Sequence, residues 1–449
     1  MTGPGEDPPS ARAGDPPDAQ VPRAPLRRVI GQIAGVNFVV VLAGLLTGPL
    51  QARALGPDGR GDLAAIMVPL GLAPMLLTFG LGSYAIYSGA RGAASRSLLG
   101  SLLPIYLIVG CLTAVLAPTV ARFFAEGRET VETFITIGLW LLPLGLFTSL
   151  LTDLAVSQQR WRQLIQVRLI PPIGQAMLIV ALFTAGALTV QSAALVFLCV
   201  APLTLIPLWG VLREATPPRF DLASVRAAVP FGAKAWVGGL GQAANARLDQ
   251  LLMIKLVSPS ELGLYVVAVT VSGFLVNPVV NAVATANSPR IAQGDRALIG
   301  RSVRTSLVAV GLTSVGLAAV SPWLLRLAFG APFVDALPIA LVLLAASVPL
   351  AGTTVLGSAL SSAGRPGVAA SAELVSLAVT IPSLILLLPV LGALGAALTS
   401  LVAYTVTLGF LLFRARAIFG GKLRDYCVPN RQDLADLRSR LPSPRSWRL

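Results

Sequence analysis

Ionisable and amide side chains lie inside a long apolar segment, residues 233–256. Asn245, Arg247 and Asp249 fall in its second half. Burying an ionised side chain in a bilayer costs at least about 2.5 to 3.5 kcal/mol on insertion scales, so such residues mark candidate functional sites. A guanidinium can donate paired hydrogen bonds to phosphate oxygens, and a carboxylate can hold or release a proton. The types of these residues therefore predict a binding site within the membrane.

Arg247 and Asp249 cannot simply neutralise each other, because residues two positions apart lie on roughly opposite faces of a helix. Asp249 shares a face with Gln242 and Asn245, which indicates that it addresses one polar surface while Arg247 addresses another. Three roles remain open for Arg247: contact with an anionic substrate, a structural salt bridge between helices, or extension of the guanidinium to the membrane surface.

Asn and Gln residues also share single helix faces in other apolar segments. Asn277 and Asn281 lie one helical turn apart at mid-span depth. Small and hydroxyl residues on such faces are explained by helix packing, whereas two adjacent amides indicate a wet cavity or a contact between two halves. Asn37 and Gln51 share a face at the first apolar segment. The candidate substrate-binding residues are therefore Arg247, Asn245, Asp249, Asn277, Asn281, Asn37 and Gln51.

Two more carboxylates are candidates for binding a coupling ion. Glu373 begins a polar face that continues through Ser376 and Thr380. If it is desolvated, it can couple a conformational cycle to protons or sodium; the alternative is that it complements the dipole at a helix start. Asp153 is expected to form an ion pair with a nearby arginine, such as Arg160, and is the second coupling candidate.

The chain as a whole has the composition of a membrane protein. Of its 449 residues, 55% are hydrophobic and 12% are charged, and the mean hydropathy is +0.78. This composition excludes a water-soluble fold, and apolar segments long enough to cross a bilayer recur along the chain. We predict an all-α integral membrane protein with about twelve transmembrane helices. The predicted spans lie near residues 29–50, 63–88, 98–120, 133–155, 169–187, 193–212, 233–256, 263–287, 304–325, 336–360, 369–390 and 393–413.

The sequence argues against an enzyme. His is absent, which excludes Ser-His and Cys-His catalysis and imidazole metal sites. The three cysteines are scattered and are expected to be free thiols. No nucleotide-binding motif is present, and the short outer connectors lack the acidic clusters of a glycosyltransferase. We therefore expect no catalytic residue, no cofactor and no metal, and a process driven by an ion gradient, the membrane potential or substrate supply.

The net charge of +14 is explained by membrane topology. With the N-terminus inside, 27 of the 34 Lys and Arg residues fall on the inner side. The positive-inside rule then places both termini in the cytoplasm, and the basic residues are expected to contact anionic headgroups and not nucleic acid. The Pro-rich residues 1–25 are expected to be disordered, with no cleaved signal peptide before the first span.

An internal repeat organises these spans into two lobes. Pro57 and Gly61 follow the first span, and Pro259 and Gly263 follow the seventh, both pairs offset by 202 residues. The offset predicts two pseudo-symmetric six-helix lobes. The linker between them is expected to form a short interfacial helix or a structured loop. The predicted domains are a cytoplasmic N-tail (1–25), an N-lobe (26–213), a linker (214–230), a C-lobe (231–414) and a basic C-tail (415–449).

The connectors after the first and seventh spans also carry a family resemblance. The stretch Arg53-Ala-Leu-Gly-Pro-Asp-Gly-Arg-Gly-Asp-Leu63 resembles the start of Wzx-like bacterial polysaccharide biosynthesis flippases. Asn245-Ala-Arg247-Leu-Asp249, with Glu261-Leu-Gly-Leu-Tyr265 and Pro289-Arg290, is similar to the opening of their second lobe. The group belongs to the multidrug, oligosaccharidyl-lipid and polysaccharide exporter (MOP) superfamily, and the resemblance covers about residues 26–415.

The resemblance implies two six-helix bundles in a V, which alternate access around a central cavity. It also implies export of an undecaprenyl-pyrophosphate-linked oligosaccharide across the bacterial cytoplasmic membrane, for which the Arg247 guanidinium would suit the pyrophosphate. The partners would be this lipid-linked oligosaccharide, the bilayer and other membrane proteins of polysaccharide assembly. Because the fold does not select the cargo, an ion-coupled multidrug antiporter, a lipid II flippase and a non-transporting assembly component remain alternatives.

Overall fold

The computed structural model describes residues 26–292 and 297–428, and this part of the chain contains helices and no strand. The predicted all-α class is therefore confirmed. The N-tail (1–25) and the last part of the C-tail (429–449) lie outside the described residues. The first helices are α1 (Leu26–Leu77), α2 (Leu81–Ala90), α3 (Ser95–Ala125), α4 (Glu129–Trp140), α5 (Leu142–Ser157), α6 (Trp161–Thr184), α7 (Val190–Val200), η1 (Ala201–Thr204) and α8 (Leu205–Ala215).

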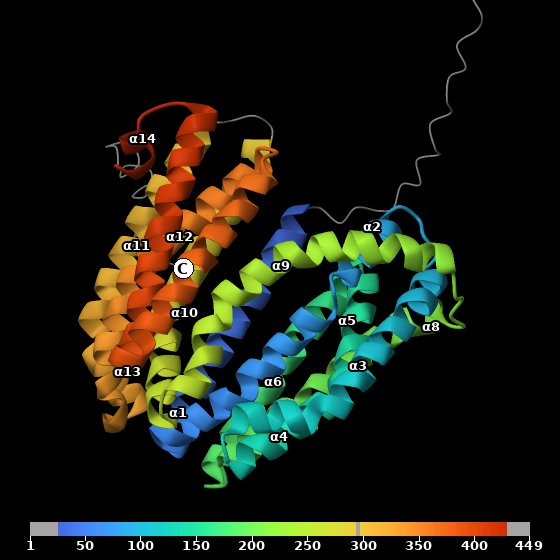
Figure 1. Ribbon diagram of the computed structural model, residues 1–449, viewed down its shortest axis with the longest axis horizontal. Helices are drawn as coiled ribbons and strands as arrows, with labels where there is room; N and C mark the ends of the chain where they lie inside the picture. Colours follow the sequence, from blue (N-terminus) through green and yellow to red (C-terminus); the bar gives the residue numbers. More distant parts are fainter. Residues whose placement is uncertain (1–25, 293–296, 429–449) are drawn as a thin grey trace, which may run out of the picture.

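The remaining helices form a second group, which α9 joins to the first. They are α9 (Leu222–Leu256), α10 (Pro259–Ala292), α11 (Ala297–Leu324), η2 (Leu325–Phe329), η3 (Ala331–Ala336), α12 (Leu337–Ser362), α13 (Pro366–Phe419) and α14 (Leu423–Cys427). The two groups meet where α1 contacts α10 and separate toward the end that carries α14 (Figure 1). This is the two-bundle arrangement expected for the fold.

Two of the helices are each too long to be a single span. A straight helix of 52 or 54 residues would extend about 80 Å, more than twice the roughly 30 Å of a hydrocarbon core. Each is broken by a glycine with positive φ, Gly56 (φ 68°) in α1 and Gly392 (φ 53°) in α13. Glycine permits this backbone because it lacks a Cβ. The breaks separate the predicted spans 29–50 and 63–88, and likewise 369–390 and 393–413.

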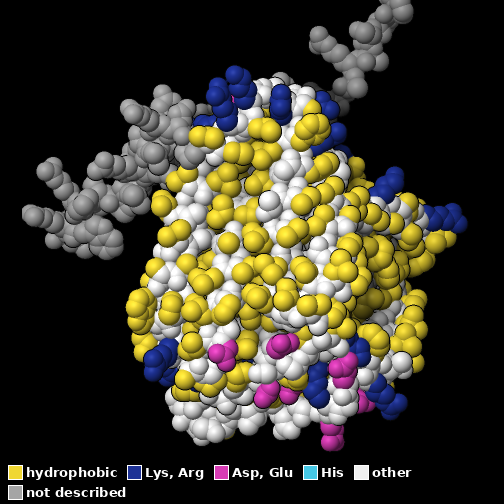
Figure 2. Space-filling view, turned by 60° about the vertical axis from the view of Figure 1, so that its left-hand side comes forward, with side chains coloured by type: hydrophobic (Ala, Val, Ile, Leu, Met, Phe, Trp, Pro, Cys, Tyr) yellow, Lys and Arg dark blue, Asp and Glu magenta, His cyan; other side chains and the backbone are white. Residues whose placement is uncertain are grey.

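The chain is a multi-pass membrane protein. Within the described residues, eight helices are long and apolar enough to cross a bilayer, or nine if α4 and α5, bent by 47°, form one span. Two of these eight are the glycine-broken α1 and α13, and α9 is not among them. Figure 2 shows hydrophobic side chains across the middle of one face, with charged side chains toward both ends. The count of twelve spans stays a prediction.

The residues matched by the internal repeat contact each other across the two halves. A Cβ added to Gly61 would lie 1.8 Å from the Pro259 carbonyl oxygen, and a Cβ added to Gly263 would lie 2.0 Å from the Pro57 carbonyl oxygen. Each glycine thus lets its helix touch the backbone of the matching proline in the other copy. This reciprocal contact supports the predicted repeat, whose lobe boundaries stay a prediction.

Helix α9 connects the two halves and replaces the short linker helix or loop that the sequence suggested. It begins at Leu222, within the predicted linker, and continues for 35 residues, or about 52 Å. Its first half is fastened to the N-terminal half: Trp236 Nε1 donates to the Leu76 carbonyl at 2.8 Å, and Ser101 Oγ donates to the Asp221 carbonyl at 3.1 Å. Its second half packs against α13 and α10.

Candidate functional site

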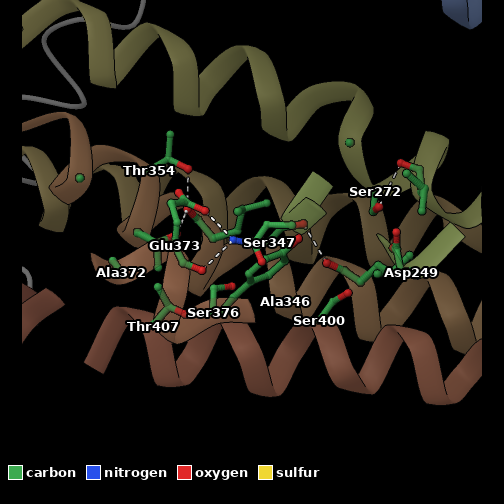
Figure 3. Close-up of a pocket in the computed structure, with 18 of the residues that line it drawn as sticks. Asp249, Ser272, Ala346, Ser347, Thr354, Ala372, Glu373, Ser376, Ser400 and Thr407 are labelled. Carbon is green, nitrogen blue, oxygen red and sulfur yellow. Dashed lines mark hydrogen bonds between the residues drawn. The ribbon is translucent and has the colours of Figure 1, made fainter. Parts of the chain in front are cut away.

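A polar cavity of about 620 Å³ lies among α9, α10, α12 and α13 (Figure 3). Its polar lining is supplied mostly by hydroxyl, amide and carboxyl side chains. These are Asn245, Asp249, Gln250, Tyr265, Ser272, Ser347, Thr353, Thr354, Ser358, Glu373, Ser376, Ser400, Tyr404 and Thr407. Ser347, Thr354 and Ser358 follow one another in α12 at spacings of seven and four residues, so they share the helix face that lines this cavity.

Asn245 and Glu373 meet directly in the cavity, although they are 128 residues apart. The Asn245 side-chain amide donates to Glu373 Oε2 at 2.5 Å and to the Glu373 carbonyl oxygen at 3.2 Å. The Asn245 Oδ1 atom is buried and has no hydrogen-bond partner. The cavity therefore holds an unused amide oxygen beside a carboxylate, a combination of oxygen ligands that suits a small cation or a bound proton.

Asp249 supplies the second carboxylate, one helical turn after Asn245. The Tyr265 hydroxyl donates to Asp249 Oδ2, and the Gln250 backbone N–H donates to Asp249 Oδ1 at 2.7 Å. These two hydrogen bonds fix the orientation of the Asp249 carboxylate. In Figure 3, Ser347 and Ser400 lie between Glu373 and Asp249, so the two acids sit in different parts of the cavity.

The charge of this cavity is negative. Among the described residues that line it there are two acids, Asp249 and Glu373, and no Lys or Arg. Two carboxylates without a basic residue in the lining make the cavity a candidate site for a cation. The same negative charge makes the cavity unsuitable for a phosphate group.

Arg247 lies on the other side of α9, as the two-residue spacing from Asp249 predicts. Its side chain is exposed, and Nη1 donates to Gln250 Oε1 at 3.0 Å. None of the four ion pairs in the described part of the chain contains Arg247. The guanidinium therefore keeps most of its donors available at the surface of α9.

The other predicted substrate residues do not join the cavity. Asn37 is exposed on α1, and Gln51 accepts a hydrogen bond of 2.5 Å from Arg60 Nη1. Asn277 and Asn281 lie in α10, but their side chains are outside the described set. The structure therefore brings together Asn245, Asp249 and Glu373 from the predicted residues and leaves Asn37 and Gln51 apart from them. Arg247 is outside the lining but contacts its residue Gln250.

Asp153 does not form the expected ion pair with an arginine. In the described part of the chain, Arg160 pairs with Glu214 instead. The Asp153 carboxylate packs against Gly82 of α2, where a Cβ would lie 2.0 Å from Oδ2. The prediction was wrong because Asp153 lies on the face of α5 that contacts α2, away from the arginines that follow the helix.

The sequence reasoning missed the aromatic hydroxyls of the cavity. Tyr265 entered only through the family resemblance, and Tyr404 was not among the candidates. A tyrosine inside an apolar span was the available signal, because a phenol hydroxyl buried in a membrane needs a polar partner. Tyr265 has that partner in Asp249.

The sequence matches a known family. Residues 50–338 match the family model described as polysaccharide biosynthesis protein. The chain belongs to this family. No curated protein matches the sequence.

Solved structures of MOP-superfamily transporters share the fold of this polysaccharide biosynthesis protein. The lipid II flippase MurJ in an inward closed conformation is 14% identical, with a TM-score of 0.71 and coverage of 89% of each chain. An inward-facing multidrug resistance transporter of the MATE family is 12% identical, with a TM-score of 0.69 and coverage of 87% of this chain and 98% of the other. The MATE multidrug transporter DinF-BH, solved in complex with a ligand, is 16% identical, with a TM-score of 0.59 and coverage of 88% and 96%.

The matched family is that of polysaccharide biosynthesis proteins, as the resemblance implied, and the fold is shared with a transporter of the MOP superfamily. The family concerns polysaccharide biosynthesis, and the fold is that of membrane transporters and flippases.

Proposed function

We propose that the protein flips a polyprenyl-pyrophosphate-linked oligosaccharide across the bacterial cytoplasmic membrane for cell-surface polysaccharide assembly. The family match over residues 50–338 supports a role in polysaccharide biosynthesis, and the two-bundle fold supports alternating access. The single observation that carries the choice of an anionic cargo is the exposed Arg247 side chain, which lies outside the lining of the acidic cavity and contacts it only through Gln250. Its guanidinium would donate to the pyrophosphate.

The acidic cavity is proposed as the coupling site of the same transporter. Asn245, Asp249 and Glu373 would hold a proton or sodium ion in one conformation more tightly than in the other, and this difference in affinity would bias the cycle. Asn245 and Asp249 are thereby reassigned from cargo binding to coupling, because no Lys or Arg is found among the described residues that line their cavity.

An ion-coupled drug antiporter is the second candidate function, supported by the fold shared with MATE transporters and by the acidic cavity, which suits a cationic compound. Reconstituted vesicles distinguish the two. We expect the protein to move a fluorescent polyprenyl-pyrophosphate oligosaccharide to the opposite leaflet, where a reducing reagent destroys its fluorescence. We do not expect the vesicles to accumulate a cationic rhodamine dye. Transport of the dye without lipid flipping would instead establish the antiporter.

The proposed orientation places both termini in the cytoplasm, together with the end of the molecule that carries α14. Cysteine substitutions at positions 57 and 259 should react with an impermeant reagent added outside intact cells, and one at position 93 should be protected. The reverse pattern would invert the topology. Other membrane proteins of polysaccharide assembly are the proposed partners.

A further inference from the structure

The first half of α9 presents an exposed face that combines apolar and basic side chains. Leu222, Val229 and Val237 are 48%, 52% and 63% exposed. Arg226 and Lys234 are also exposed; Arg226 lies among these side chains, and Lys234 lies at the edge of the face, about 80° around the helix from Arg226. The spacings of four, three and eight residues from Leu222 through Arg226 and Val229 to Val237 keep these residues on one side of the helix. The opposite side, with buried Ala228 and Gly232, packs on the N-terminal half.

The positive charge of this face is not neutralised within the described part of the chain. Arg226 and Lys234 form no ion pair or side-chain hydrogen bond there. Between residues 215 and 248 the only acid is Asp221, and its carboxylate caps α9 by accepting from the Ala223 and Ser224 backbone N–H groups at 3.0 and 3.1 Å. The Ser224 hydroxyl and these N–H groups lower the pKa of Asp221, so it stays bound to the helix start.

Arg247 continues the same face at the far end of the helix. It follows Leu222 by 25 residues, which is almost seven whole turns, and follows Arg226 by 21 residues, or about 32 Å of helix. That length is close to the thickness of a hydrocarbon core. One face of α9 thus carries cations near both ends and exposed apolar side chains near its start.

We propose that this face of α9, formed by Leu222, Arg226, Val229, Lys234 and Val237, is the entry site for the polyprenyl-pyrophosphate end of the cargo. The inference rests on the proposed function and extends it from Arg247 to the start of the helix. The two basic side chains bind the pyrophosphate as the lipid arrives laterally from the bilayer, and the apolar side chains contact the first isoprenoid units. Arg247 receives the pyrophosphate deeper along the same face.

The occupant follows from the chemistry of the face. A drug-like cation would be repelled by Arg226 and Lys234, and a free sugar would leave Leu222, Val229 and Val237 unused. A lipid with two linked phosphates matches both features at once. An ordinary anionic phospholipid offers the same classes of contact but only one phosphate, so it is the competitor that the experiment has to exclude.

The test measures binding of a sugar-free polyprenyl pyrophosphate to the full-length protein in phosphatidylcholine nanodiscs. We expect the double variant Arg226→Ala/Lys234→Ala to bind about tenfold more weakly than the unaltered protein, a loss of about 1.4 kcal/mol. Arg213→Ala is the matched control, because Arg213 is an exposed arginine in the last turn of α8 and lies outside the face. The control should bind normally.

Three results would overturn the entry site. Normal binding by the double variant, with weakened binding by Arg247→Ala, would refute the entry site and leave the proposed function intact. Absence of binding by the unaltered protein would refute both. Loss of the tenfold difference when phosphatidylglycerol replaces one tenth of the phosphatidylcholine would assign the face to ordinary anionic lipids. Persistence of the difference in that mixture supports the entry site.

Discussion

The two sides of α9 differ in charge although they belong to one helix. On one side, Asn245 and Asp249 face a cavity that contains two carboxylates and no basic residue among its described lining. On the other side, Arg226, Lys234 and Arg247 are exposed. The two environments adjoin at Gln250, which lines the cavity and accepts a hydrogen bond from Arg247 Nη1 at 3.0 Å.

Under the proposed function, this difference would let one helix serve both an anionic cargo and a coupling cation. If Arg247 faced the cavity, it would pair with Asp249 and remove both groups from function. Keeping them two residues apart places them on opposite faces. If a proton or sodium ion binds in the cavity and α9 moves, the face that carries Arg226, Lys234 and Arg247 would move with it.

The largest effect is expected from removing Arg247, the basic residue farthest along the exposed face of α9. Arg247→Ala should lower lipid flipping in reconstituted vesicles about 100-fold, because no other described cation continues the face at that depth and hydrogen bonds between charged groups are worth up to about 3 kcal/mol. Protein level and elution volume should be unchanged, and Arg213→Ala should flip normally. Flipping at the normal rate would remove Arg247 from the cargo site, and loss of the folded protein would indicate a structural role.

Removing an acid from the cavity side should have a smaller and different effect. Glu373→Gln keeps the size of the side chain and mimics the protonated acid, so flipping should fall about tenfold and lose its dependence on a pH or sodium gradient. Binding of the polyprenyl pyrophosphate should persist, because the cargo uses the other side of α9. Near-normal rates with unchanged gradient dependence would remove Glu373 from the coupling site; a helix-dipole role is not available to it, because Glu373 lies two turns after the start of α13 at Pro366.

Asn245→Leu should also lower the rate of flipping, but only about threefold. It removes the amide that donates to Glu373 Oε2 and leaves both carboxylates in place. We expect the gradient dependence to shift along the pH or sodium axis and not to disappear, measured by the same vesicle assay. An effect on polyprenyl-pyrophosphate affinity would contradict the separation of the two sides.

The smallest effect is expected where α9 is fastened to the N-terminal half. Trp236→Phe removes the indole N–H that donates to the Leu76 carbonyl and keeps most of the aromatic contact with Phe79. The loss should be about 1 kcal/mol, seen as a small decrease in the thermal unfolding temperature of the detergent-solubilised protein. Full retention of that temperature, together with slower flipping, would give Trp236 a role in motion and not in stability.

Local periodicity predicted part of this picture. The two-residue spacing of Arg247 and Asp249 was enough to place them on different surfaces, and the 202-residue offset identified prolines and glycines that do meet. Both inferences concern backbone geometry within one helix or one repeated connector. The apolar segments likewise predicted where most helices lie, but not the breaks after Leu77 and Trp140 or the start of α9 at Leu222, within the linker predicted for residues 214–230.

The contacts between distant segments were beyond such reasoning. Asn245 and Glu373 are on different helices, and nothing in either local sequence indicates the register in which α9 and α13 pack. The same limitation misassigned Asp153, whose neighbour is a glycine of α2 and not an arginine close in sequence. Side-chain partners depend on helix rotation, which a single sequence constrains only weakly.

The reciprocal contact of Gly61 and Gly263 has a consequence for how this chain can change over time. Each glycine faces a main-chain oxygen of the other repeat, so no side-chain replacement in the partner can make room for a larger residue. A second substitution in the partner therefore cannot compensate for replacement of either glycine. The two halves can diverge almost everywhere else, but here each copy is expected to hold the other to its original residue.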